Sequence, residues 1–178
     1  MIELNEELIA ARELRTAGYH EAAHKTVYER FGGAGDAVVW KNNSGNPEER
    51  AWLGQFRPRT CPEAMRRAAV TAGITFPDLP ANWSFLYGMA GLAAEEILNS
   101  ETDEPGVIAD AVRYRISSDE ASATDLAAMG ITAIDDYQLS DEDVEESVWI
   151  LQEGWPAVKQ EAEHLIEVAV SGLVSDER

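Results

Sequence analysis

The spacing of apolar residues along the chain predicts a mainly α-helical protein. Residues 5–31 carry apolar side chains at helical intervals and stop at a pair of glycines, with a break into two helices allowed near Gly18. Residues 82–99 are apolar on nearly every side, which is typical of a buried central helix. The tail from residue 140 opens with a helix-capping pattern and continues as two amphipathic helices. An array of about six helices is expected.

One part of the chain has a different pattern. Residues 35–58 contain two runs of β-favouring residues, DAVVWK and AWLGQF, on either side of a polar, turn-rich stretch, and this predicts a two-stranded β-ribbon. Residues 107–116 leave helix and strand both open. Because no repeat or linker divides the chain, residues 1–178 are expected to form a single domain, with a core over about 5–130 and an acidic helical tail over 140–178.

The overall charge disfavours several classes of partner. The 178 residues include 14 Lys and Arg against 33 Asp and Glu, a formal net charge of −19. Such a chain repels phosphate backbones and anionic lipid headgroups, so neither nucleic acid nor a membrane is expected as a partner. No segment has the ~20 apolar residues of a membrane span, the N-terminus lacks a secretory signal, and Cys61 is the single cysteine. These features are typical of a soluble cytoplasmic protein.

The charges are also unevenly distributed. Most acids of the tail over 140–178 are expected on a solvated helix face. Residues 41–67, by contrast, carry an excess of Lys and Arg, including Arg57 and Arg59. Two interpretations stay open for this basic segment, since it could attract an acidic or unstructured peptide or pair with the acidic tail.

A short motif in the first helix indicates chemistry. His20, Glu21 and His24 form an H-E-x-x-H pattern in a helical context. Two histidines four residues apart lie on one helix face, about 6 Å apart along the axis, so both imidazoles can reach one Zn²⁺ ion. Glu21 is then placed to accept a proton from water during attack on a carbonyl. The motif predicts a zinc-dependent hydrolase.

The residues alone leave the third zinc ligand open. A catalytic zinc site usually takes three protein ligands and leaves one position for water. Glu95 and Glu96 on the buried central helix are candidates, and one of them is alternatively expected to orient a ligand histidine from outside the metal. His164 is a weaker candidate because it lies on the acidic, amphipathic tail.

Three blocks in this order, GYHEAAHKTV, GLAAEEI and SSDEASATDLA, resemble the zinc protease domains of FtsH-type proteins, which are otherwise attached to AAA+ ATPases. The resemblance implies a helical protease fold with a two-stranded ribbon. It also implies that Zn²⁺ is held by His20, His24 and Asp119, and that Glu21 is catalytic. The local pattern places Asp119 in the first turn of a helix over 118–130 that Ser117 or Ser118 caps.

The chain also departs from the family pattern. Ala23 replaces a glycine in the motif, and Ser118 replaces an asparagine in the third block. No G-x-x-x-x-G-K-[ST] motif occurs, so the chain is expected to work without an ATPase module of its own. A separate ATPase partner is compatible with the sequence, but no residue supports it.

The expected function is therefore zinc-dependent hydrolysis of peptide bonds in unfolded or flexible polypeptide. The run AWLGQFRP is similar to the substrate-side strand of the family, and its residues Trp52, Leu53, Gly54 and Gln55 are expected to pair with an extended substrate. In this interpretation the N–H of Gln55 faces outward. Two alternatives on the same scaffold stay open, namely a non-catalytic acidic binding module and a metallohydrolase that acts on a non-peptide substrate.

Overall fold

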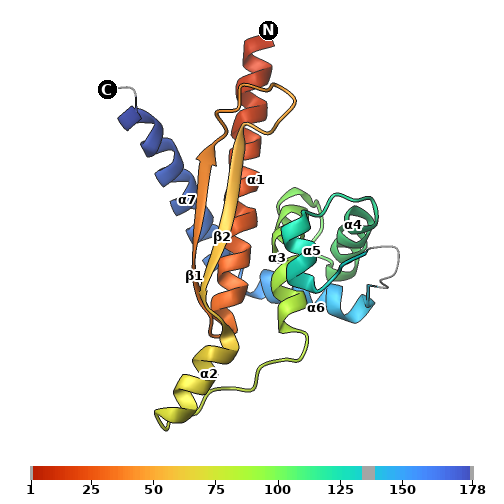
Figure 1. The fold of residues 1–178 in the computed structure, drawn as a ribbon. Coiled ribbons are helices and arrows are strands. Elements are labelled where there is room, and N and C mark those ends of the chain that lie inside the picture. Colours follow the sequence, from red (N-terminus) through yellow and green to blue (C-terminus); the bar gives the residue numbers. More distant parts are fainter. Residues whose placement is uncertain (1, 134–138, 177–178) are drawn as a thin grey trace.

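The computed structural model describes residues 2–133 and 139–176, which form seven helices and one two-stranded antiparallel sheet (Figure 1). The helices are α1 (Ile2–Arg30), α2 (Pro62–Thr71), α3 (Trp83–Asn99), α4 (Pro105–Ser117), α5 (Ala123–Met129), α6 (Asp141–Glu153) and α7 (Trp155–Asp176). The strands are β1 (Ala34–Lys41) and β2 (Trp52–Thr60). The prediction of a mainly helical protein with one ribbon is confirmed. Over the described ranges, no helix combines the length and apolarity needed to cross a bilayer.

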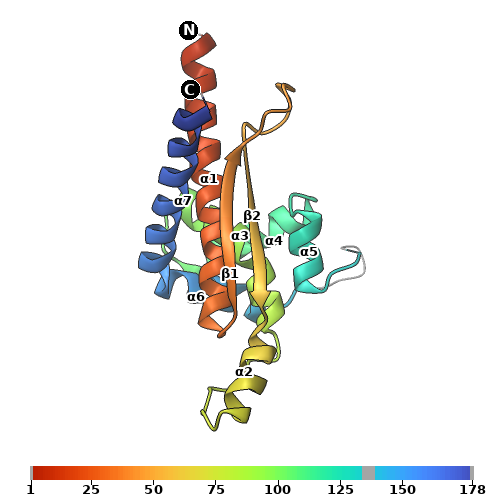
Figure 2. The same cartoon turned by 60° about the vertical axis from the view of Figure 1, so that its left-hand side comes forward.

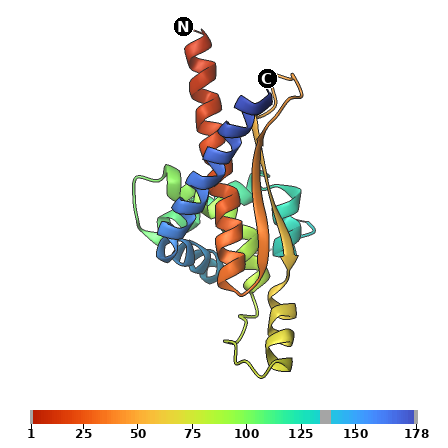
Figure 3. The ribbon, with the colours of Figure 1, turned by 90° about the vertical axis from the view of Figure 1, so that its left-hand side faces the viewer.

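Helix α1 is the element around which the others pack. It contacts α3, α7 and both strands. The ribbon runs along α1, and helices α3, α4, α5 and α6 form a group next to α1 (Figure 1). Helix α7 crosses α1 on another side, as Figure 3 shows. Strand β2 lies on the side of the ribbon that faces α5 (Figure 2).

Helix α1 is continuous, so the break allowed near Gly18 does not occur. Gly18 serves a different purpose, because a Cβ atom at this position would lie 2.9 Å from Cγ1 of Ile166 on α7. The missing side chain therefore lets α7 pack closely against α1. The end of the helix is as predicted, since Gly32 has a φ of +85° and its N–H donates to the carbonyl of Glu29.

The ribbon has a register that decides which backbone groups are free. Asn42 continues the register of β1, and its N–H donates to the carbonyl of Ala51 at 2.8 Å. Hydrogen-bonded and non-hydrogen-bonded pairs alternate along an antiparallel ladder, so the odd-numbered residues from 53 to 57 bond to β1. The even-numbered residues of β2 direct their N–H and C=O groups to the open edge. Pro58, which has no N–H, fits at such an outward position.

The segment over 107–116 is helical and belongs to α4. Ile108, Val112 and Ile116 are buried at four-residue intervals, which gives α4 one apolar face. The helix ends in a Schellman motif, in which the N–H of Asp119 donates to the carbonyl of Ile116 and the N–H of Glu120 to the carbonyl of Arg115. Asp119 has a φ of 61°, as the residue after the helix cap requires.

The expected start of the next helix at Ser117 or Ser118 is therefore wrong. Ser117 is the last residue of α4, and Ser118 is its C-cap. The next helix, α5, begins five residues later at Ala123, and its N-cap is Ser122. The physical reason is that the chain needs a left-handed turn at residue 119 to leave α4 before α5 can start.

One interpretation paired the basic residues of the ribbon with the acidic tail, and over the described ranges Arg59 does not follow it. Arg59 forms an ion pair with Asp36 on the neighbouring strand. Contact between the tail and the rest of the protein is made elsewhere, for example between Lys25 Nζ on α1 and Glu161 Oε1 on α7 at 2.7 Å. The open edge of β2 is therefore not tied to the tail through Arg59.

Candidate metal centre and active site

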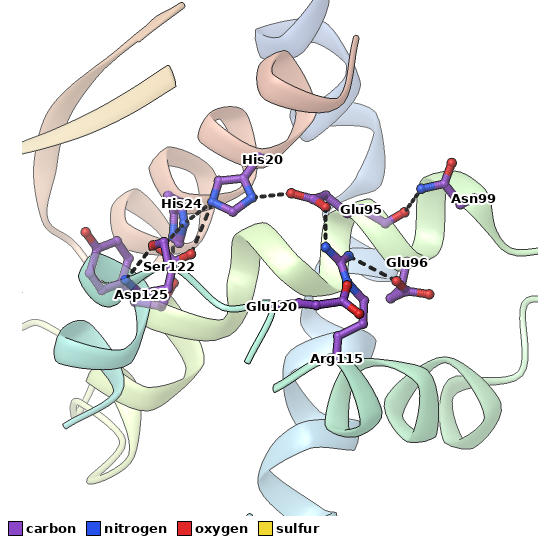
Figure 4. Close-up of polar contacts among 10 residues, drawn as sticks. His20, His24, Glu95, Glu96, Asn99, Arg115, Glu120, Ser122 and Asp125 are labelled. Carbon is purple, nitrogen blue, oxygen red and sulfur yellow. Dashed lines mark hydrogen bonds and ion pairs between the residues drawn. The ribbon is translucent and has the colours of Figure 1, made fainter. Parts of the chain in front are cut away.

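The histidine pair of the motif lies where α1 meets α3 and α5 (Figure 4). His20 and His24 are one helical turn apart, and their Nε2 atoms are separated by 3.1 Å. Ala22 and Ala23 between them are fully buried, so neighbouring elements pack closely against this part of α1. His20 also packs directly on α3, because a Cβ atom at Gly91 would lie 2.4 Å from its Nε2 atom.

Contacts at the opposite ring nitrogens determine which face of each imidazole is available. His24 Nδ1 donates to the backbone carbonyl of Tyr87 at 2.9 Å, and His20 Nδ1 donates to Glu95 Oε1 at 2.7 Å. Burial acts to raise the pKa of Glu95, but the hydrogen bond from His20 and the charge of Arg115 hold this pKa below its ordinary value. When each ring is neutral with its proton on Nδ1, its Nε2 lone pair is available, and the two Nε2 atoms face each other.

The third residue at this point is Asp125 on α5. Its Oδ1 lies 3.1 Å from His24 Nε2, and its Oδ2 lies 3.5 Å from His20 Nε2. One ligand atom from each of these three residues lies within 4.8 Å of the other two. Asp125 is 5% exposed.

The expectation of Asp119 as third ligand is corrected by this geometry. Asp119 is an exposed residue of the turn that ends α4 and lies outside the cluster. Asp125 is positioned by Ser122, whose Oγ accepts the Asp125 N–H at 3.0 Å. The sequence did hold this signal, because Ser122 and Asp125 have the spacing of a capping box. The same spacing correctly predicted Ser140 as the N-cap of α6.

The charges around the cluster fit a cation. Burial acts to lower the pKa of His20, but the hydrogen bonds that His20 donates to Asp125 and Glu95 outweigh it and raise this pKa to about 10. The hydrogen bonds from His20 and His24 lower the pKa of Asp125 despite its burial. Among the described residues, Oδ2 of Asp125 is a buried oxygen with no hydrogen-bond partner. Two facing Nε2 atoms and a carboxylate oxygen make a donor set that Zn²⁺ accepts, and nitrogens bound to one tetrahedral Zn²⁺ lie about 3.3 Å apart.

Glu21 lies beside this cluster and under strand β2. It is 7% exposed, and its burial raises the pKa of its carboxyl group above the ordinary value, while His20 and His24 oppose the rise. The backbone amide of Phe56 also lowers this pKa by hydrogen bonding. A Cβ atom at Gly54 would lie 2.5 Å from Cγ of Glu21, so only glycine lets β2 pass this close. A raised pKa suits a carboxylate that accepts a proton near neutral pH.

A pocket of about 530 Å³ opens over the cluster. Strand β2 forms one wall and α5 forms another, with His20, Glu21 and His24 among the lining residues. The predicted substrate strand is therefore next to the histidines. Its residues differ in orientation, because the side chains of Trp52 and Phe56 are buried, whereas Leu53 and Gln55 are exposed.

The predicted role of the Gln55 backbone is wrong. Residue 55 is opposite Val38 in a hydrogen-bonded pair, so its N–H bonds to β1 and is not free for a substrate. A proline at position 55 would therefore break the ribbon. The backbone groups of Gly54 are the ones at the open edge, directly over Glu21.

The other candidate ligands occupy different places. Glu95 accepts the hydrogen bond of His20 Nδ1, on the side of the ring away from the cluster, and Glu96 contacts Arg115 at 3.0 Å. His164 is exposed on α7, outside the cluster. The sequence interpretation gave no role to Arg115 or to the carbonyl of Tyr87, because neither has a motif and both act through contacts between distant segments.

Comparisons of the chain with models of known protein families and with curated proteins found no match. The likeness to FtsH-type protease domains therefore stays a prediction from three short blocks. What supports a function for this site is its own geometry.

Proposed function

We propose that this protein is a zinc-dependent peptidase that hydrolyses peptide bonds in unfolded or flexible polypeptide. The observation that carries the proposal is the cluster of His20, His24 and Asp125, with ligand atoms within 4.8 Å of one another. Anchored Nδ1 atoms behind both histidines are typical of metal-binding imidazoles. Glu21 beside the cluster adds a group that is able to accept a proton.

In this proposal, different residues of the site bind the metal and transfer the proton. His20, His24 and Asp125 would hold Zn²⁺, which supplies a Lewis acid for the carbonyl and increases the acidity of water. The Glu21 carboxylate accepts a proton from water in the pocket and returns it to the leaving amine. The amide of Phe56 and the packing of Gly54 keep this carboxylate against β2.

The open edge of β2 supports a peptide as the substrate. An extended peptide can add to an exposed strand edge through backbone hydrogen bonds, which require little of its sequence. The outward-facing N–H and C=O of Gly54 lie over Glu21 and line the same pocket as Asp125. A chain bound there would have a carbonyl close to the cluster. Folded segments cannot add to an edge in this way, so flexible polypeptide is the proposed substrate class.

Glu21→Gln and His20→Ala test the proposal together. Glu21→Gln is expected to keep zinc and the fold and to reduce cleavage of an unfolded, fluorogenic protein by about 10²–10⁴-fold, because the amide cannot accept a proton. His20→Ala is expected to lose both zinc and cleavage. Zinc content is measured by elemental analysis after reconstitution, and cleavage with and without a chelator.

Three outcomes contradict the proposal in different ways. A parent protein that takes up no zinc would remove the metal site, and full turnover by Glu21→Gln would remove the role of Glu21. A parent protein that binds one zinc without cleaving any polypeptide would favour the non-catalytic binding module.

A further inference from the structure

A layer of charged residues lies behind the candidate metal centre, and Arg115 of α4 is its centre (Figure 4). Arg115 Nη2 donates to Glu95 Oε2 at 2.8 Å, Nη1 to Glu96 Oε1 at 3.0 Å, and Nε to Glu120 Oε2 at 3.0 Å. The Arg115 side chain is only 16% exposed. A guanidinium group holds its N–H donors in a rigid plane, so it fixes the three carboxylates relative to one another.

Through Glu95, Arg115 reaches the histidine side of the site. One oxygen of Glu95 binds Arg115, and the other accepts the hydrogen bond from His20 Nδ1 at 2.7 Å. Nε2 lies across the ring from Nδ1, so the position of the Glu95 carboxylate sets the direction in which Nε2 points. Glu95 is 5% exposed, and its carboxylate is held between His20 and Arg115.

Through Glu120, Arg115 reaches the aspartate side. Glu120 is held twice, because its N–H donates to the Arg115 carbonyl at 3.0 Å and its carboxylate binds Arg115 Nε. Two residues further on, Ser122 caps α5 and accepts the N–H of Asp125. The loop between Glu120 and Ser122 is too short to let α5 move independently of this anchor.

We propose that Arg115 is a positioning residue that fixes the two sides of the metal centre relative to each other. It binds Glu95 behind His20 and Glu120 ahead of Asp125, and it belongs to neither the ligand set nor the reacting groups. This inference rests on the proposed function, since it concerns the same site. It predicts that metal affinity depends on a residue that never touches the metal.

Arg115→Gln is the direct test, and Arg113→Gln is its matched control. Arg113 lies two residues earlier on α4 and forms ion pairs with Asp110 and Asp141, away from the cluster. Arg115→Gln is expected to weaken zinc binding by about 10–100-fold in a chelator competition assay and to change the visible spectrum of the Co²⁺-loaded protein. We expect kcat to fall more than KM. Arg113→Gln is expected to leave all of these unchanged.

Two further variants distinguish the contact of Arg115 with Glu95 from its contact with Glu120. Arg115→Lys keeps the charge but loses the planar fork, so we expect an intermediate zinc affinity. Glu120→Ala breaks only the loop arm and is expected to weaken zinc binding while the His20 Nδ1–H signal in NMR spectra of the metal-free protein stays in place. Arg115→Gln is expected to shift or broaden that signal.

These measurements distinguish a failure of the proposed function from a failure of the positioning role of Arg115. If the parent protein binds no zinc, the proposed function fails, and the His20 signal in metal-free Arg115→Gln still tests the positioning role. Unchanged zinc affinity, Co²⁺ spectrum and His20 signal in a folded Arg115→Gln variant would overturn it. Equal losses in Arg115→Gln and Arg113→Gln would also overturn it, because a general loss of stability would then explain both.

Discussion

The two sides of the candidate metal centre are built in different ways. On the histidine side, His20 and His24 belong to one long helix, α1, and are separated by a single turn. On the aspartate side, Asp125 belongs to a helix of seven residues that follows an irregular loop. Helix geometry fixes the spacing of the two histidines, whereas the position of Asp125 depends on several contacts along the chain and between helices.

This difference shows where such a site is sensitive. An i, i+4 pair keeps its spacing wherever the helix lies. The position of Asp125 requires the Schellman end of α4, the Ser122 cap and the packing of α5 on α3. That packing is close, because a Cβ atom at Gly88 of α3 would lie 2.7 Å from the backbone N of Met129. Substitutions that touch neither the metal nor the histidines can therefore disturb the aspartate side.

The largest effect is expected from Asp125→Asn, with the same substitution at Asp119 as its control. Asp125→Asn removes the charge of the proposed ligand and is expected to weaken zinc binding by more than the ~10–100-fold that loss of an outer contact causes. Asp119→Asn is expected to leave zinc affinity unchanged, since asparagine also accepts a positive φ and the residue is exposed. Isothermal titration with Zn²⁺ measures both. The reverse ranking would restore Asp119 as the ligand and refute the geometry of α5.

A smaller effect is expected from a substitution in α3, against which His20 packs. Gly91→Ala introduces a Cβ atom about 2.4 Å from His20 Nε2, so the imidazole must move. We expect zinc affinity to fall about 10-fold while the helix persists, because alanine is a better helix former than glycine. Gly106→Ala is the matched control, since its nearest neighbour lies at 3.6 Å. Equal zinc affinities in the two variants would show that the histidine side does not depend on α3.

The smallest effect concerns the turn before α5. Asp119→Gly relieves a positive φ in a residue other than glycine and is expected to raise the free energy of unfolding by about 1 kcal/mol. For a chain of this size the shift in Tm is about 2–4 °C. Thermal unfolding monitored by circular dichroism measures it, with zinc affinity expected to stay the same. A lower Tm would mean that the Asp119 side chain contributes a contact that stabilises the turn.

Local sequence signals determined a large part of this molecule. The glycine pair predicted the C-terminal end of α1, the capping pattern at Ser140 predicted the start of α6, and the β-favouring runs predicted the ribbon. The H-E-x-x-H spacing placed His20 and His24 on one face of the helix, with Glu21 about 100° round from His20. Each of these features depends on residues within about one helical turn or one hairpin of each other.

The tertiary structure alone decided the rest. It placed Asp125, and not Asp119, beside the two histidines, directed the N–H of Gln55 into the ribbon, and gave Arg115 its three carboxylate partners. Because of a left-handed turn at the end of α4, α5 starts several residues later than the sequence predicted. The register of the ribbon directs the N–H of Gln55 toward β1, opposite to the predicted direction. Such outcomes depend on how segments far apart in the chain pack and pair. A spacing rule confined to one segment carries no information about them.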